Sequence, residues 1–225
     1  MKEVQDKFLR WKGFWYLLTR DREQTLLKHF FHHPLVYGWR ALRSYVLRRP
    51  YIKDENRYLY NVSSFQDITS LLARKDSYLI LGISYCQKPL DCPCGRFNTN
   101  CIHEDKNEIC KNCFIKGAYD KFPKDRGEFI VLTTVHYIAN KILNIMYSNP
   151  NKKCVFAMCA CPLSLEMFSD WGNVIAMPGI GLSLCGPVCS SMRAFKLAEV
   201  GVKPLKTELK SSSEIALDQI LEILK

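Results

Sequence analysis

Short apolar runs alternate with helical patterns over the second two-thirds of the chain. Continuous apolar runs at residues 78–83, 129–133, 155–158 and 174–177 predict buried strands. Apolar residues at helical spacing follow these runs and also occur near the end of the chain, at residues 135–146, 163–168, 187–200 and 215–224. We predict an α/β fold, with a mainly parallel sheet, helices on both faces and a cysteine-rich insertion after the first strand.

The N-terminal part of the chain has a different pattern, rich in aromatic and basic residues. Helical spacing predicts amphipathic helices at residues 3–19, 26–31 and 37–47. A polar stretch at residues 50–62 is typical of a linker, and Ser64 with Asp67 matches a capping box that opens a helix. We therefore predict two parts, a basic helical subdomain with its linker at residues 1–62 and a cysteine-rich α/β domain at residues 63–225.

Two interpretations of the N-terminal helices stay open. Aromatic residues at helical spacing usually pack against a core, which favours a subdomain docked on the main domain. Aromatic residues on one face and basic residues on the other also suit an anionic bilayer surface, so residues 1–50 form a candidate membrane anchor. His29, His32 and His33 have helical spacing, but a basic surface is a better interpretation than a metal site.

The composition narrows the choice of partner and compartment. The chain has 225 residues, of which 48% are hydrophobic, and a formal net charge of +10. Such a charge favours an acidic partner: nucleic acid, an anionic membrane surface or an anionic substrate. The N-terminus has no signal-peptide pattern, and no run of about 18 apolar residues predicts a membrane-spanning helix. We expect a cytoplasmic protein with free thiols, and peripheral binding at the inner face of the membrane if the anchor forms.

Eleven cysteines are confined to residues 86–189, and a metal explains such crowding better than packing does. Cys86 follows the first predicted strand, Cys159 and Cys161 the third, and Cys185 and Cys189 the fourth. The carboxyl ends of parallel strands meet at one edge of a sheet, so these thiols are expected to converge there. The insertion adds Cys92, Cys94, Cys101, Cys110 and Cys113.

Iron–sulfur clusters tolerate irregular cysteine spacing better than zinc sites do, because the cluster is large and its ligands come from distant loops. We expect one or two clusters, of the 4Fe–4S type, with zinc as the alternative. The first ligand set is Cys86, Cys110, Cys113 and Cys159, with Cys185 or Cys189 as a substitute. A second set, for a cluster or zinc, is Cys92, Cys94 and Cys101, and Cys161 is a further candidate ligand of a second metal. Cys154 is expected to be a packed hydrophobic residue.

Two stretches are candidates for substrate binding. The segment from Pro178 to Pro187 contains Gly179, Gly181 and Gly186, and a glycine-rich loop lets backbone amides approach a ligand closely. Thr133 and Thr134 lie where the second strand meets its helix, and they bind an anion or cap that helix. His136 is a candidate ligand or proton donor at the same edge.

The order of these motifs resembles an uncharacterised cysteine-rich family, domain of unknown function 116, over residues 77–200. The stretches that carry the resemblance are Ser84-Tyr-Cys86, Cys110-Lys-Asn-Cys113, Thr133-Thr134, Phe156-Ala-Met-Cys159 and Cys185-Gly-Pro-Val-Cys189. A weak match at the glycine pair and a one-residue offset of Cys189 depart from the pattern. The resemblance implies the fold and a metal site without supplying a reaction.

These observations favour an iron–sulfur redox protein or cluster-dependent enzyme that acts on a small or anionic substrate, with a redox partner. The alternative is a zinc-stabilised module that recruits nucleic acid or another acidic partner through the basic stretch at residues 40–49.

Overall fold

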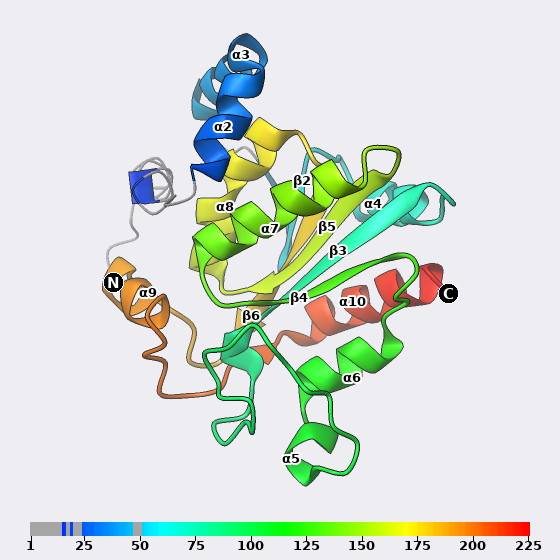
Figure 1. Ribbon diagram of the computed structural model, residues 1–225, viewed down its shortest axis with the longest axis vertical. Coiled ribbons are helices and arrows are strands. Elements are labelled where there is room, and N and C mark those ends of the chain that lie inside the picture. The colour runs from blue at the N-terminus through cyan, green and yellow to red at the C-terminus, as the bar shows by residue number, and fades with distance from the viewer. Residues whose placement is uncertain (1–14, 17–18, 20–23, 47–50) are drawn as a thin grey trace.

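The computed structural model describes residues 15–16, 19, 24–46 and 51–225, so most of the helix predicted at residues 3–19 lies outside the described residues. The fold is α/β, as predicted (Figure 1). The strands are β1 (Ile52–Asp54), β2 (Arg57–Tyr60), β3 (Ser77–Ser84), β4 (Gly127–Leu132), β5 (Lys153–Ala160), β6 (Gly179–Cys185) and β7 (Glu208–Leu209). The helices are α2 (Thr25–His32), α3 (Pro34–Val46), α4 (Phe65–Leu72), η1 (Tyr85–Gln87), α5 (Glu108–Lys111), α6 (Phe114–Lys121), α7 (Val135–Ser148), α8 (Pro162–Ile175), α9 (Met192–Ala198) and α10 (Ser211–Ile223).

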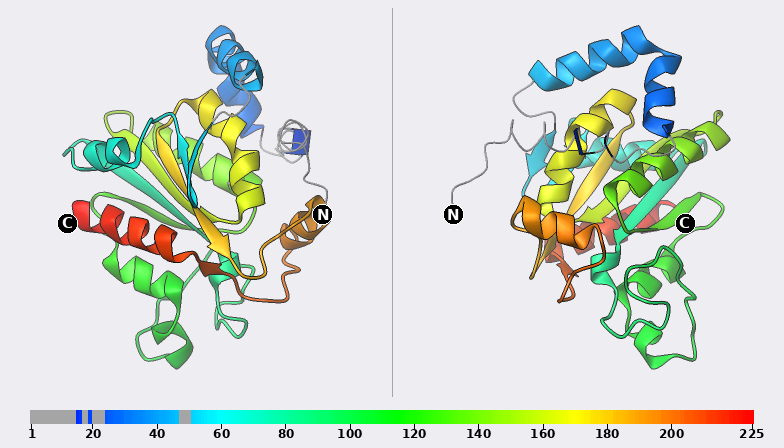
Figure 2. Two further views of the ribbon diagram at one scale, coloured as in Figure 1. Left: turned by 180° about the vertical axis from the view of Figure 1, so that it is seen from behind. Right: turned by 60° about the vertical axis from the view of Figure 1, so that its left-hand side comes forward.

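The strands form one sheet in the order β1-β2-β6-β5-β3-β4, and β7 pairs with β6. The pairs β3–β4, β3–β5 and β5–β6 are parallel, so β4, β3, β5 and β6 end at a common edge, which we call the carboxyl edge. This sheet is covered on both faces, as predicted. One apolar cluster packs the residues of α7, α8 and α9 on one face, and a second packs those of α4, α6 and α10 on the other (Figure 2).

The stretch predicted as a linker is instead part of the sheet. β1 and β2 form a hairpin whose turn has Glu55 at φ 51°, and β2 pairs antiparallel with β6. Tyr58, Leu59 and Tyr60 are all buried. The polar residues that suggested a linker belong to the turn, while the buried strand beside it is only four residues long.

The predicted fourth strand at residues 174–177 is wrong. Val174 and Ile175 complete α8, which ends where Ala176 takes a left-handed conformation with φ 54°. The strand is β6, whose glycines had suggested a loop. A Cβ on Gly179 would lie 2.4 Å from the Phe156 ring, and one on Gly181 would lie 2.6 Å from Leu165. Glycine is needed there because neighbouring side chains cross the strand closely.

The starts of three helices can be compared with the sequence. The capping box is confirmed, because the Asp67 amide donates to Ser64 Oγ at 3.2 Å and the Ser64 amide donates to the Asp67 carboxylate at 2.9 Å. The three serines at residues 211–213 do not cap the last helix, since Lys210 precedes its first turn and Ser213 Oγ instead accepts from the Ser183 amide at 3.1 Å. α9 is shorter than the predicted helix at residues 187–200.

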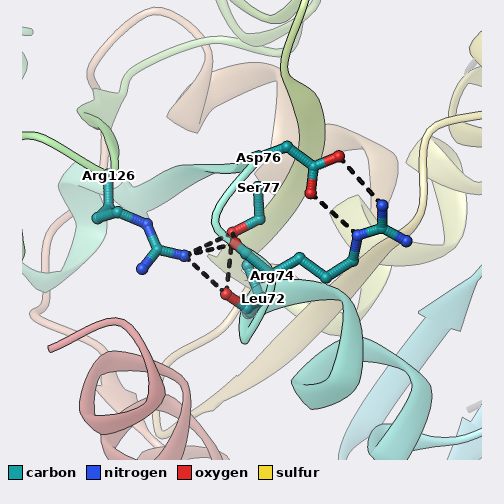
Figure 3. A network of polar contacts seen from close by, with 5 residues as sticks. All are labelled: Leu72, Arg74, Asp76, Ser77 and Arg126. Carbon is teal, nitrogen blue, oxygen red and sulfur yellow. Dashed lines mark hydrogen bonds and ion pairs between the residues drawn. The ribbon is translucent and has the colours of Figure 1, made fainter.

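A polar network fastens the start of β3 to the segment that leads into β4 (Figure 3). Arg126 Nη2 donates to the carbonyl oxygens of Leu72 and Arg74 and to Ser77 Oγ, at 2.8–2.9 Å. Ser77 Oγ donates to the carbonyl oxygens of Leu72 and Arg74 at 2.9 and 2.7 Å. The network lies where β3 begins, far along the strand from the carboxyl edge.

In the part of the chain that the structure describes, no helix has the length and apolar content needed to cross a membrane.

Candidate metal and thiol site

The chain leaves β3 through the 3-10 turn η1 and enters an insertion that includes α5 and α6. α6 packs on one face of the sheet, and α5 lies beyond the end of the sheet (Figure 1). Eight of the cysteines divide into two sets around η1. One set lies in the insertion, and the other lies at the carboxyl edge of the sheet. We call the two cavities the insertion pocket and the edge pocket.

The insertion pocket is a cavity of about 10 Å³ with a wall rich in thiols. It is also lined by the two lysines Lys88 and Lys116 and by Pro89. Its cysteines come from three short segments that are adjacent only in the folded chain: Cys92, Cys94, Cys101, Cys110 and Cys113. The structure thus brings together members of both ligand sets that the sequence suggested.

Backbone amides point at the sulfur atoms of this pocket. The Ile102 amide donates to Cys94 Sγ at 3.3 Å. Burial raises the pKa of Cys92 and of Cys101. In each case the backbone amide two residues later donates to the sulfur and so lowers the pKa. Such amides stabilise the thiolate, which is the form that binds a metal.

Lys88 is wholly buried, with none of its side chain exposed, and its ammonium organises the loop that carries the first cysteines. Nζ donates to the carbonyl oxygens of Asn98 and Asn100 at 2.8 and 3.0 Å, and a longer contact of 3.4 Å reaches Gly95. Its positive charge lowers the pKa of Cys92 and Cys101 against the effect of burial. A buried ammonium therefore provides a positive charge where several thiolates would gather.

Cys110 lies in α5, and Cys113 follows in the tight turn that leads into α6. Asn107 caps α5 by accepting from the amides of Ile109 and Cys110 at 2.9 and 3.3 Å. The Cys113 amide donates to the Cys110 carbonyl at 3.0 Å, and Cys113 is the N-cap residue of α6. This turn places both sulfur atoms on the wall of one cavity.

The edge pocket is a cavity of about 50 Å³ at the carboxyl edge. Its thiols follow three different strands: Cys86 in η1 after β3, Cys161 after β5 and Cys189 after β6. Cys161 Sγ lies 3.0 Å from Ser164 Oγ, and Lys203 Nζ lies 3.5 Å from Cys189 Sγ. The convergence expected from the topology therefore brings these three thiols together.

Among these three thiols, Cys161 has the surroundings that most favour the thiolate form. It is the N-cap residue of α8, with Pro162 in the first turn. The Cys189 thiol donates to its sulfur, Ser164 adds a hydroxyl and an amide, and together they lower the pKa of Cys161 although burial opposes this. The same contact raises the pKa of Cys189. These contacts therefore favour the thiolate form at Cys161 and the protonated form at Cys189.

A buried carboxylate also lines the edge pocket. Glu199, just after α9, accepts from the Val135 amide at 3.1 and 3.2 Å and so caps the N-terminus of α7. Thr134 Oγ1 also caps α7, by accepting from the Tyr137 amide at 3.3 Å. The sequence did not indicate Glu199, because its partner lies 64 residues away, nor did it single out Ser164 or Lys88.

The structure places the other predicted cysteines outside both pockets. Cys159, predicted as a primary ligand, is fully buried in the apolar cluster that contains α4 and α10, and burial raises its pKa. Cys185 ends β6 opposite Glu208 and lines neither pocket. Cys154 packs against the other apolar cluster.

The predicted substrate-binding residues separate in a similar way. Thr133 and Thr134 line the edge pocket, whereas His136 does not. Gly179 and Gly181 lie within β6, where close side chains explain them, so they do not form a ligand loop. Gly186 has φ 78° just after β6, where a glycine allows the turn into the Cys189 loop.

Among the described residues, no three His, Cys, Asp or Glu side chains are arranged so that they could hold a metal ion as they stand. Comparisons with family models, curated proteins and solved structures found no match to this chain. The resemblance to domain of unknown function 116 therefore stays a prediction, and the function is argued from the chemistry of the two pockets.

Proposed function

We propose that this protein is an iron–sulfur redox protein, with a 4Fe–4S cluster held by four of the five cysteines of the insertion pocket. The observation that carries the proposal is the gathering of five thiols around one pocket that also contains amide donors and a buried ammonium. Thiolates are the ordinary ligands of such clusters.

The surroundings of the five thiols suit a centre with negative charge. Hydrogen bonds to sulfur and nearby charge are the protein's means of stabilising a cluster and setting its potential. Here the Ile102 amide and the Lys88 ammonium supply both. A cluster bound there would supply or accept single electrons.

The edge pocket contains a pair of thiols that would exchange electrons with such a cluster. Cys161 and Cys189 form a thiolate–thiol pair, and their oxidation to a disulfide releases two electrons and two protons, or one proton where Cys161 is already a thiolate. Reduction reverses both changes. The two pockets lie on either side of η1, since residues 84–86 line one and residues 88–89 line the other. Arg96 ties the cysteine loop to this turn by donating to the Cys86 carbonyl at 3.1 Å.

The first experiment is the iron, acid-labile sulfide and zinc content of protein purified without oxygen. We expect about four irons and four sulfides per chain. The variants Cys94→Ser and Cys113→Ser should lose most of the iron and the visible absorption. The matched controls Cys154→Ser and Cys185→Ser, which lie outside both pockets, should keep both. Equal loss in all four variants would contradict the assignment.

A single zinc ion is the second candidate, and the small size of the insertion pocket favours it. A cavity of about 10 Å³ is close to the space that one water molecule needs. Zinc binds four thiolates in a tetrahedron and stabilises a small fold outright. Colourless protein with one zinc and no sulfide would establish this candidate, leaving the insertion as a structural module and the edge pocket without its electron source.

A further inference from the structure

The helix α3 exposes its apolar residues to solvent. Leu35, Trp39, Leu42 and Val46 follow one another at spacings of four, three and four residues, which places them on one helical face. Their exposed fractions are 88%, 67%, 53% and 70%. A surface helix normally turns such a stripe toward the core. We call these four residues the outer stripe of α3.

The face of α3 that contacts the main domain is polar at its centre. Ser44 is the buried residue of this helix, and its hydroxyl donates to the Asp170 carboxylate of α8 at 2.6 Å. Asn173 Nδ2 of α8 donates to Ser44 Oγ at 3.3 Å. The helix is thus held to α8 by hydrogen bonds, while its apolar stripe faces away from the core.

The charged residues of α2 and α3 all have one sign. Residues 25–46 contain Lys28, Arg40 and Arg43 and no aspartate or glutamate. Phe31 of α2, which is 65% exposed, adds a further aromatic ring at the neighbouring helix. An apolar stripe with basic neighbours is complementary to a partner that has an apolar interior and anionic groups at its boundary with water.

The position of α3 leaves the insertion pocket free. Figure 1 shows α2 and α3 at one end of the long axis and α5, in the insertion, at the other. Figure 2 shows the two helices projecting from the body of the fold. A flat surface can therefore meet α3 without covering the insertion.

From this geometry we propose that the outer stripe of α3 docks on an anionic lipid bilayer. The stripe enters the boundary between headgroups and acyl chains, where a tryptophan ring is favoured, and the basic side chains meet lipid phosphates. A second copy of this chain is a poorer occupant, because two copies would bring the same basic residues together.

The test is sedimentation of the whole protein with vesicles of phosphatidylcholine alone or mixed with phosphatidylglycerol. We expect binding to the mixed vesicles that weakens as salt is raised, and little binding to phosphatidylcholine. The double variant Trp39→Ser/Leu42→Ser should bind the mixed vesicles at least about tenfold more weakly, since two apolar side chains no longer leave water.

The matched control is Val202→Ser/Ile215→Ser, which removes two apolar side chains that are also exposed, at 54% and 61%, from other parts of the surface. This control should bind as the parent protein does. Equal binding by both double variants, or no binding by the parent, would overturn the proposal. So would a dimer in solution that the α3 variant alone abolishes, because a second copy would then be the occupant. Metal content should be unchanged in both variants, so this test is separate from that of the iron–sulfur proposal.

Discussion

The ammonium of Lys88 donates to the carbonyl oxygen of Asn98 at 2.8 Å from a wholly buried position. The bond spans ten residues of chain, and the cysteines Cys92 and Cys94 lie between its two ends. A buried charge is retained only where it is well compensated. Here backbone carbonyl oxygens compensate it directly, and thiolates beside it would do so further. Lys88 thus links the shape of the cysteine loop to the charge of the thiols that the loop carries.

The variant Lys88→Met should damage the loop because it leaves the carbonyl oxygens of Asn98 and Asn100 without their donor. We expect the free energy of unfolding to fall by about 2 to 3 kcal/mol, and bound metal to be lost faster to a chelator. Denaturant unfolding and chelator kinetics measure the two effects. Lys106→Met, which removes an exposed lysine from the same insertion, is the matched control and should change neither. A Lys88 variant as stable as the control would contradict this role.

Mild oxidation should join Cys161 to Cys189. Hydrogen peroxide converts the two thiols to one disulfide and two molecules of water, and the Cys161 thiolate is the attacking group. Peptide mapping without reductant should recover this disulfide as the main product in metal-free protein. Cys161→Ser should abolish it, and Cys154→Ser should not. A dominant disulfide from Cys86 to Cys189 would show that a different pair reacts.

The order of strands and helices follows largely from local pattern. The apolar runs at residues 78–83 and 155–158 lie in β3 and β5, and the run at residues 129–133 overlaps β4 up to residue 132, because a strand buried on both faces needs such a run. β6 was missed because its glycines at 179 and 181 are explained only by Phe156 and Leu165, which belong to other elements. No local pattern carries that information.

The grouping of the cysteines was harder to predict for the same reason. Chain topology indicates that Cys86, Cys161 and Cys189 approach one edge, and these three line the edge pocket. It does not indicate how the insertion folds, which instead gathers Cys110 and Cys113 with the cysteines of the Lys88 loop. Cys159 lies only two residues before Cys161, but the end of β5 falls between them, so one faces the core and the other the pocket.

Arg126 should contribute far more to stability than the neighbouring ion pair of Arg74 with Asp76. Arg126→Ala removes a donor from two carbonyl oxygens and a hydroxyl, and we expect a loss of about 2 to 3 kcal/mol in the free energy of unfolding. Arg74→Ala breaks a two-contact ion pair at 3.0 and 3.1 Å that is exposed to solvent, so its effect should be small. Denaturant unfolding of both variants compares them directly, and equal losses would refute the ranking.

His29 should make the fold less stable in mild acid. Burial in the contact between α2 and α7, with His32, His33 and Arg40 nearby, lowers its pKa below the ordinary 6.5, and its ring pairs with the Tyr147 hydroxyl. Below pH 6.5 the unfolded chain therefore binds a proton that the folded protein resists, and stability present above pH 6.5 is lost as the pH falls toward the lowered pKa. Each pKa unit by which the folded value lies below the unfolded value lowers the free energy of unfolding in acid by about 1.4 kcal/mol. Melting temperatures between pH 5 and 7.5 should fall less steeply in His29→Gln than in the parent. His32→Gln removes only one of the charges that lower the pKa of His29, so its slope should lie between those of the parent and His29→Gln. The same slope in all three proteins would assign the acid sensitivity to other groups.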